Sequence, residues 1–205
     1  MAAGVTSGTL ATDLTSVPHG PVRTVTLTPH PDTPADAVHS IRARLQRYTD
    51  GTLAVMYMID GALDRLRIPQ ARQARVAERL WQHTCCEIFV RRGTALAYHE
   101  FNFSPSGEWA AYSFDAYRDG ARLQEDALDP GVTVRRTSVT LELDALVRLT
   151  RLSPMHAGDA LSLSLTAVIE DRDGVLSYWA LAHPPGKPDF HHRDAFVLEL
   201  DEIRN

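Results

Sequence analysis

The chain has 205 residues, of which 44% are hydrophobic and 23% are charged, and its formal net charge is −5. This length suits one large β domain or two small ones, and all-β domains of this size are commonly single; such a chain buries a full core without disulfides or metal ions. The 21 basic residues form no block, so the sequence lacks the basic footprint of a phosphate-binding surface, and we expect no nucleic-acid partner. No apolar run approaches the roughly 18 residues that a membrane span requires, and we expect no membrane partner.

The two cysteines and the N-terminal segment indicate the compartment. Cys85 and Cys86 are adjacent, and neighbours on a strand point to opposite faces, so a disulfide between them would be strained. The first 20 residues are rich in Gly, Ser, Thr and Ala and lack the basic and apolar regions of a signal peptide. We therefore expect a flexible leader over residues 1–20, one domain over residues 21–205 and a cytoplasmic location.

Short segments of β-type alternation, separated by turn signals, fill the first part of the chain. A first strand is predicted over residues 22–28, and Asp50-Gly51 predicts a hairpin turn between strands at 35–48 and 53–59. Residues 63–68 predict another strand. Residues 70–78 have helical propensity but little apolar face, which favours a surface loop or a short helix.

The same rhythm continues to the C-terminus. Strands are predicted over residues 85–91, 95–103, 108–115, 132–136, 138–143, 161–169, 176–181 and 195–200. Between them we expect a long loop at 119–130, a helical turn at 144–149, and a loop at 153–159. About ten short strands, with no internal repeat and no parallel βαβ rhythm, predict an all-β protein: an antiparallel, jelly-roll-like β-sandwich.

Residues 80–120 concentrate the aromatic and reactive side chains, because they hold both cysteines, two of the three Trp and four of the six Phe. Period-2 alternation places one set on one face of the strand and the other set on the opposite face: Tyr98, Glu100 and Asn102 against His99, Phe101 and Phe103. One face can join a core while the other presents an aromatic ring, a carboxylate and an amide. A half-exposed strand without function shows the same pattern, so this recognition face is a hypothesis.

A second polar cluster occupies residues 183–194, which contain three His and two Asp. Imidazole and carboxylate groups suit zinc or iron, but no metal-binding spacing such as His-Glu-x-x-His occurs. The three prolines of this segment favour a rigid loop whose histidines form hydrogen bonds with the backbone. A polar ligand site that includes His183, Asp189 and His191 is the second interpretation, and a metal site is the third.

Two kinds of residue could be catalytic or could have a structural role only. Cys85 or Cys86 could act with His83 or His183, but a cysteine within a strand is usually a small buried hydrophobe. Glu87 and Glu100 could form the carboxylate pair of a glycoside hydrolase. Neither pattern carries a specific catalytic motif.

Haem is a further possible ligand. The absence of Cys-x-x-Cys-His excludes covalent c-type attachment. A non-covalent haem would need axial ligands, for which Met56, Met58, Met155 and His183 are available. Single methionines in strands more often belong to a core.

Two motif blocks carry a family resemblance. Leu80-Trp81 with Cys85-Cys86-Glu87-Ile88-Phe89, followed by Tyr98-His99-Glu100 and the segment to Gly107, resembles the DOMON-like domains, which are related to family 9 carbohydrate-binding modules. The tail Tyr178 to His183, with Pro188-Asp189-Phe190-His191, resembles the bacterial MurB-like subgroup of that set. The similarity covers roughly residues 20 to 200.

The resemblance implies an immunoglobulin-like β-sandwich that binds a sugar or haem and catalyses no reaction. In the carbohydrate-binding relatives, an aromatic pair sandwiches a sugar and a nearby Glu binds its hydroxyl groups. By position, Trp81 would be one aromatic wall and Glu87 the carboxylate, and both Trp109 and Trp179 are candidates for the second wall. Aromatic faces stack on sugar C–H surfaces, and a carboxylate is a strong hydroxyl acceptor.

We therefore predict a non-catalytic module that binds a carbohydrate or a similar small polar ligand, without a metal site or a required cofactor. The predicted ligand-binding residues are Trp81, Glu87, Glu100, Asn102 and Trp109, completed by His183, Asp189 and His191. The alternatives are a non-covalent haem-binding module, a hydrolase or metal-dependent enzyme that uses Glu87 and Glu100 or His191 and His192, and an interaction domain without a small ligand.

Overall fold

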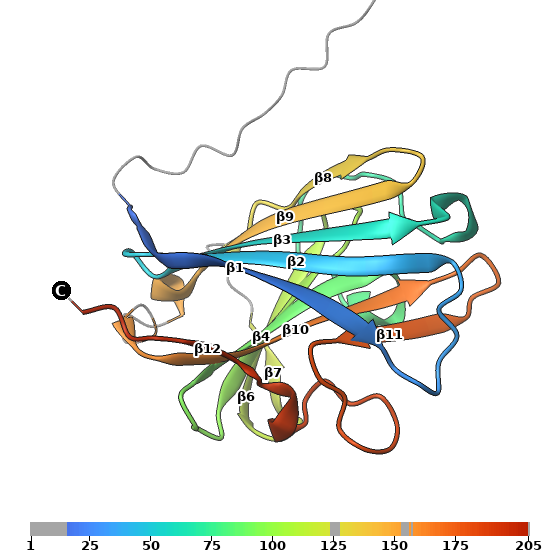
Figure 1. Ribbon diagram of the computed structural model, residues 1–205. Coiled ribbons are helices and arrows are strands. Elements are labelled where there is room, and N and C mark those ends of the chain that lie inside the picture. The colour runs from blue at the N-terminus through green and yellow to red at the C-terminus, as the bar shows by residue number, and fades with distance from the viewer. Residues whose placement is uncertain (1–15, 124–127, 153–155, 157, 205) are drawn as a thin grey trace, which may run out of the picture.

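The structure is a computed structural model and describes residues 16–123, 128–152, 156 and 158–204. These residues form an all-β sandwich of twelve antiparallel strands in two layers (Figure 1). The strands are β1 (Pro18–Pro29), β2 (Val38–Tyr48), β3 (Thr52–Gly61), β4 (Cys85–Arg92), β5 (Tyr98–Phe103), β6 (Trp109–Ala116), β7 (Asp119–Arg122), β8 (Thr133–Arg136), β9 (Thr140–Arg148), β10 (Leu161–Glu170), β11 (Leu176–Ala180) and β12 (Leu198–Leu200). Short 3-10 turns join them: η1 (Leu63–Arg65), η2 (Leu80–Gln82), η4 (Leu149–Arg151) and η5 (Arg193–Ala195).

Strand β1 belongs to both layers. It pairs with β2 as far as Leu27, and its last residues, Thr28 and Pro29, pair with β11. Layer A therefore has the order β1-β2-β3-β9-β8, and layer B has the order β7-β6-β5-β4-β10-β11, with β12 beside β10. β7 and β8 lie at the two ends of this strand order and do not pair with each other, so the sheet is not closed. In Figure 1, β1 leaves layer A and reaches β11 at the right-hand end.

The core lies between the layers because alternate residues of each strand point inward. Layer A contributes fully buried side chains such as Ile41 and Leu143, and layer B contributes Ile88, Phe101 and Leu165. This alternation is the period-2 pattern of the sequence, and the opposite set of each strand forms the outer faces. The outer face of layer B carries the site described below.

Most predicted strands are confirmed, including both hairpins, and the closing strand predicted over 195–200 is confirmed only for Leu198–Leu200, because η5 extends to Ala195. The strand predicted over 63–68 is wrong: η1 begins there, and Leu63 and Leu66, three residues apart, both reach the core. The predicted helical turn at 144–149 is also wrong, because β9 continues to Arg148 with Ala145 and Val147 facing inward. The expected loop at 119–130 contains β7. Residues 70–78 form an irregular segment without a helix.

Three predictions for irregular segments fall partly outside the described residues, and residues 124–127 of the loop predicted at 119–130 are among those outside. Of the leader predicted over residues 1–20, residues 1–15 lie outside them, and Pro18 to Gly20 belong to β1. Residues 153–155 and 157 of the loop predicted at 153–159 also lie outside them. In the described parts of the chain, no helix has the length and apolar character needed to cross a bilayer.

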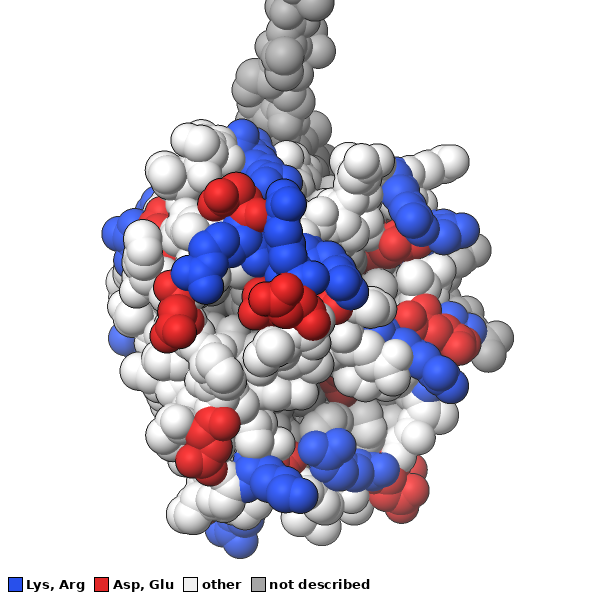
Figure 2. Space-filling model, turned by 90° about the vertical axis from the view of Figure 1, so that its right-hand side faces the viewer, with Lys and Arg blue, Asp and Glu red and all other residues white. Residues whose placement is uncertain are grey.

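Charged residues of both signs mix on the surface. Figure 2 shows the face at the right-hand end of Figure 1, where Lys and Arg alternate with Asp and Glu. Ion pairs join some of the surface charges: Arg135 of β8 lies 2.9 Å from Glu142 and 2.6 Å from Asp144 of β9. This face therefore presents no large field of one sign.

Candidate functional site

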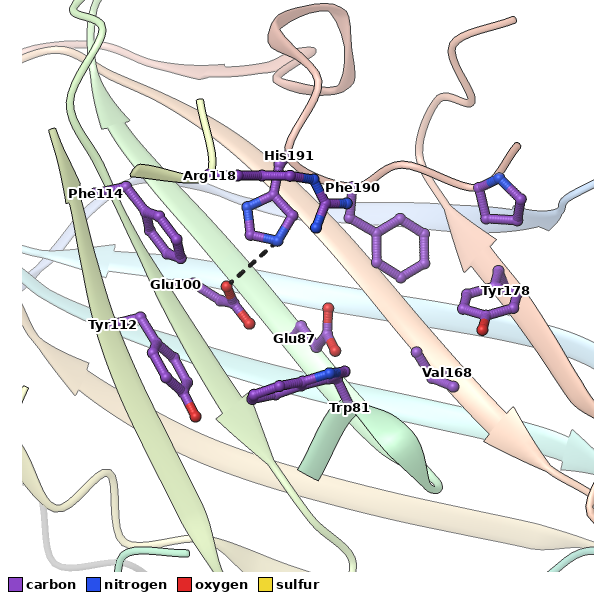
Figure 3. Close-up of a pocket in the computed structure, with 11 residues that line it drawn as sticks. Trp81, Glu87, Glu100, Tyr112, Phe114, Arg118, Val168, Tyr178, Phe190 and His191 are labelled. Carbon is purple, nitrogen blue, oxygen red and sulfur yellow. Dashed lines mark ion pairs between the residues drawn. The ribbon is translucent and has the colours of Figure 1, made fainter. Parts of the chain in front are cut away.

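A pocket of about 360 Å³ opens on the outer face of layer B. Five of its lining residues are aromatic and four carry ionisable groups other than phenol: the lining consists of Trp81, Glu87, Glu100, Tyr112, Phe114, Arg118, Val168, Tyr178, Pro188, Phe190 and His191. In Figure 3 the carboxyl groups of Glu87 and Glu100 lie near the middle, with the rings around them. A concave site with apolar walls and a few polar groups is the usual form of a small-molecule site.

The floor of the pocket comes from outward-facing residues of neighbouring strands. In the register of β4 and β5, Glu87 lies opposite Asn102, and Glu100 lies opposite Phe89. Glu87 and Glu100 are therefore diagonal neighbours on one face, close enough for long side chains to interact. Tyr112 of β6 lies opposite Glu100 and extends the floor to the next strand.

Segments outside the sheet form the walls. Trp81 belongs to η2, which follows Arg79 in the left-handed conformation at φ 58°, and its ring packs edge-on against Tyr112 at 5.6 Å between centroids. The Nδ1 atom of His83 lies 2.8 Å from a carboxylate oxygen of Glu170 on β10, which ties η2 to the sheet. The opposite wall consists of Phe190, Pro188 and His191 from the loop that follows β11 (Figure 3).

Glu87 is a buried carboxyl group with one free oxygen. Its side chain is 2% exposed, and Oε2 accepts a hydrogen bond of 3.1 Å from the Thr166 hydroxyl of β10. Oε1 is buried and has no hydrogen-bond partner in the protein. Burial, and then the nearby charge of Glu100, raises the pKa of Glu87 well above 4.5 and favours its protonated form.

Glu100 lies beside it with more partners. Oε1 accepts a hydrogen bond of 2.6 Å from the side-chain amide of Asn102, and Oε2 is 3.7 Å from Nε2 of His191. Burial raises the pKa of Glu100 to about 7, against the opposing effects of Asn102 and the Arg118 charge. This carboxyl group thus changes its charge near neutral pH.

His191 is held in place by its ring contacts and by Tyr98. Its ring packs edge-on against Phe114 and Phe89 at 5.1 and 5.2 Å, and Nδ1 lies 2.8 Å from the Tyr98 hydroxyl. Burial, with the charge of Arg118, lowers the pKa of His191 to about 4, so the imidazole is neutral at pH 7.

Asp189 organises the upper rim. Its Oδ1 atom accepts hydrogen bonds from Nη2 of Arg118 at 2.9 Å and from the backbone N–H of His191 at 3.2 Å, and Oδ2 accepts one of 2.8 Å from the Tyr117 hydroxyl. Tyr117 and Arg118 form the two-residue turn between β6 and β7, where Arg118 has φ 55°. The loop after β11 is therefore joined to the far edge of layer B across the pocket.

The structure brings six of the eight predicted ligand-binding residues to this place. Four of them line the pocket: Trp81, Glu87, Glu100 and His191. The other two of the six form hydrogen bonds with lining residues, Asn102 with Glu100 and Asp189 with Arg118. The remaining two of the eight lie elsewhere. Trp109 is 2% exposed in the core, and His183 places Nε2 2.8 Å from the backbone oxygen of Thr28 at the end of β1.

Neither candidate for a second tryptophan wall faces the pocket. Trp109 and Trp179 both point between the layers, because they occupy inward positions of β6 and β11. The wall opposite Trp81 holds Phe190 instead (Figure 3). Sequence reasoning missed Tyr112, Phe114, Arg118, Tyr178 and Phe190. The period-2 pattern of β6 contains a signal for Tyr112 and Phe114, since both share the face opposite to Trp109 and Ala111.

The candidate haem and metal ligands do not converge. Met56 and Met58 lie on the outer face of layer A, and Met155 lies outside the described residues. The imidazole of His183 forms a hydrogen bond with the backbone oxygen of Thr28. No group of three or more potential metal-ligating His, Cys, Asp or Glu side chains occurs within the described ranges. Cys85 and Cys86 are fully buried, and burial raises the pKa of both thiols, which opposes formation of a thiolate nucleophile.

Comparisons with solved structures give matches of different strength. One is the crystal structure of a "putative carbohydrate-binding protein" from Bacteroides uniformis ATCC 8492, with a TM-score of 0.60 and 15% identity over 85% of this chain and 84% of that chain. Another is a carbohydrate binding module family 9 (CBM9) from Caldicellulosiruptor kristjanssonii in complex with glucose, with a TM-score of 0.42 and 14% identity over 72% and 69% of the two chains. No protein-family model matches the chain, and no curated protein matches it. The chain thus shares its sandwich fold with the Bacteroides protein.

Proposed function

We propose that this protein is a non-catalytic module that binds a carbohydrate, or a similar small polar ligand, in the pocket on the outer face of layer B. The observation that carries the proposal is Oε1 of Glu87, a buried polar atom without a protein partner, in a residue that lines a pocket with aromatic walls. A buried polar group without a partner is costly, so a ligand that supplies the missing hydrogen bond gains from it.

The pocket combines the two features that sugar binding needs. Rings such as Trp81 and Phe190 offer apolar faces for the C–H surface of a pyranose, and the two carboxyl groups offer hydrogen bonds to its hydroxyls. Its volume lies at the small end of the roughly 300 to 1,000 Å³ typical of ligand pockets, which suits a monosaccharide or a chain end. The Bacteroides protein of similar fold is described as carbohydrate-binding, and the sequence blocks around Trp81 and Glu87 resemble DOMON-like domains.

The protonation of the carboxyl pair supports binding over hydrolysis. Glycoside hydrolysis needs one protonated carboxyl group and one carboxylate that stays ionised as nucleophile or base. At pH 6, the raised pKa of Glu87 and the pKa of about 7 of Glu100 keep both carboxyl groups mostly protonated, so the pair lacks the ionised group. We therefore expect no release of chromophore from aryl glycosides under conditions in which the sugars bind.

The test is a titration of monosaccharides and short oligosaccharides into the purified protein, followed by calorimetry and by Trp fluorescence. Trp81→Ala should abolish binding, because Trp81 lines the pocket. It should leave the fold intact, because the side chain is 39% exposed and contributes little to the core. Val139→Ala is the matched control, because it removes an exposed apolar side chain from the turn between β8 and β9, which is not part of the pocket lining. Unchanged affinity in Trp81→Ala, or saturable binding of haemin that excludes sugars, would contradict the proposal.

A further inference from the structure

The pocket lining contains two carboxyl groups but no positively charged side chain that is paired with them at pH 7. Glu87 and Glu100 are only 2% and 5% exposed. Of the two basic residues in the lining, Arg118 is paired with Asp189 at 2.9 Å, and His191 is neutral at pH 7. Buried charges are stable only when opposite charges and hydrogen bonds compensate them, so two ionised carboxylates here would require a cation from outside the protein.

We propose that this cation is the ammonium group of the ligand, bound between Glu87 and Glu100, and that the ligand is an amino sugar with a free amine. The inference rests on the proposed sugar-binding function and narrows its ligand class. An ammonium group has three N–H donors and no acceptor, which matches a site made of carboxyl oxygens. Oε1 of Glu87 supplies the unpartnered acceptor, and Oε2 of Glu100, at 3.7 Å from His191, is only loosely engaged.

The walls of the pocket suit the same ligand. Trp81 and Tyr112 stand on one side of the carboxyl pair, and Phe190 stands on the other (Figure 3). Aromatic faces attract a cation placed within about 6 Å of the ring centre, and they also pack against sugar C–H groups. A ligand with an ammonium group next to a pyranose ring uses both properties, whereas a neutral sugar leaves the carboxyl pair protonated.

Binding of an ammonium group should release protons. In the empty pocket the pKa of both carboxyl groups is raised, and a cation between them favours their ionised forms. The polar and titratable groups near the pair come from several adjoining elements: Cys85 of β4, Tyr98 and Asn102 of β5, Tyr112 of β6, Thr166 of β10, Tyr178 of β11, Arg118 of the β6–β7 turn and His191 of the loop after β11. His191 is already neutral above pH 5, so the carboxyl pair is the source of the released protons near pH 6.

The experiment is isothermal titration of the full chain at pH 6 with four probes: D-glucosamine, D-glucose, N-acetyl-D-glucosamine and cyclohexylamine. We expect glucosamine to bind at least about tenfold more tightly than glucose, as a close charge pair can supply. Repeating the titration in two buffers of different ionisation enthalpy measures the protons released. Their number should fall as the pH rises above 7.

Two near-isosteric variants test the two carboxyl groups separately. Glu87→Gln and Glu100→Gln should each bring the ratio of glucosamine to glucose affinity close to one. Glu108→Gln is the matched control, because Glu108 is also buried, at 8% exposure, but its carboxylate pairs with Arg75 outside the pocket. In this control the affinity ratio should stay as in the parent protein.

The possible failures can be told apart. Equal affinities for the three sugars, without proton release, would overturn the ammonium inference and leave the sugar-binding function in place. Binding of no sugar at all would overturn both. Cyclohexylamine binding as tight as that of glucosamine would overturn the amino sugar as the ligand, because the hydroxyl groups would then add nothing.

Discussion

Glu100→Gln should make the protein more stable at high pH while leaving its stability at low pH unchanged. Burial raises the pKa of Glu100 from 4.5 to about 7 in the folded protein. A group whose pKa is higher in the folded state contributes stability that is fully present below pH 4.5 and is lost as the pH rises through 7. At about 1.4 kcal/mol for each pH unit, the loss approaches about 3 kcal/mol above pH 8.

Glutamine keeps the shape and the hydrogen bonds of the site without the charge. Its Oε1 atom can still accept from the Asn102 amide, which lies 2.6 Å from Glu100 in the parent protein. Because Glu100 is 5% exposed, solvent screens little of the effect. The substitution also removes a negative charge beside Glu87, whose pKa that charge raises, and this adds to the gain in the same direction.

The assay is urea unfolding of both proteins at pH values from 4.5 to 8.5. The difference in free energy of unfolding should rise from about zero to about 3 kcal/mol, with its midpoint between pH 5 and 7. Glu202→Gln, in a residue whose side chain is 52% exposed, is the control and should show no such rise. A difference that is constant with pH, or that favours the parent protein at pH 8, would refute this account of the pocket.

Three further predictions concern the pocket and the core. Trp81→Ala should cost less than about 1.5 kcal/mol of stability, whereas Trp109→Ala, which removes a ring that is 2% exposed, should cost about 3–5 kcal/mol in urea unfolding. Tyr57→Phe should cost about 1–3 kcal/mol, because the Tyr57 hydroxyl donates to the backbone oxygen of Glu87 across the core; a neutral result would show that this oxygen finds another donor. The pKa of His191 is lowered to about 4, so stability should fall as the pH decreases from 6.5 towards 4, and an equally steep fall in His191→Gln would exclude this residue as a cause.

Local patterns in the sequence predicted the strands well, because period-2 alternation reports directly which side chains reach the core. The same patterns placed Glu100 and Asn102 on the face opposite to Phe101, as the structure confirms. Strand prediction from this alternation failed where buried residues do not belong to a strand. Leu63 and Leu66 are buried from a 3-10 turn, which a short apolar run does not distinguish from a strand.

The walls of the pocket could not be predicted in the same way. Phe190 and Arg118 come from a loop and a turn that are far apart in the sequence, and the pairing of Arg118 with Asp189 brings them together. No local periodicity encodes such a contact. Trp109 was a candidate for the second aromatic wall that the family resemblance implied, whereas its inward position in β6 makes it part of the core.

The division of β4 and β5 into an inner and an outer face separates folding from recognition at the level of single residues. In β4, Cys86 and Ile88 belong to the core, while Glu87 between them belongs to the pocket. Specificity can therefore be redesigned at the outer positions while the packing between the layers stays the same. The same arrangement makes the alternation of inward and outward side chains along the strand sensitive to insertions and deletions. Deleting one residue from β4 would move a carboxyl group into the core and an isoleucine into the pocket, so this strand can change in composition but not in length.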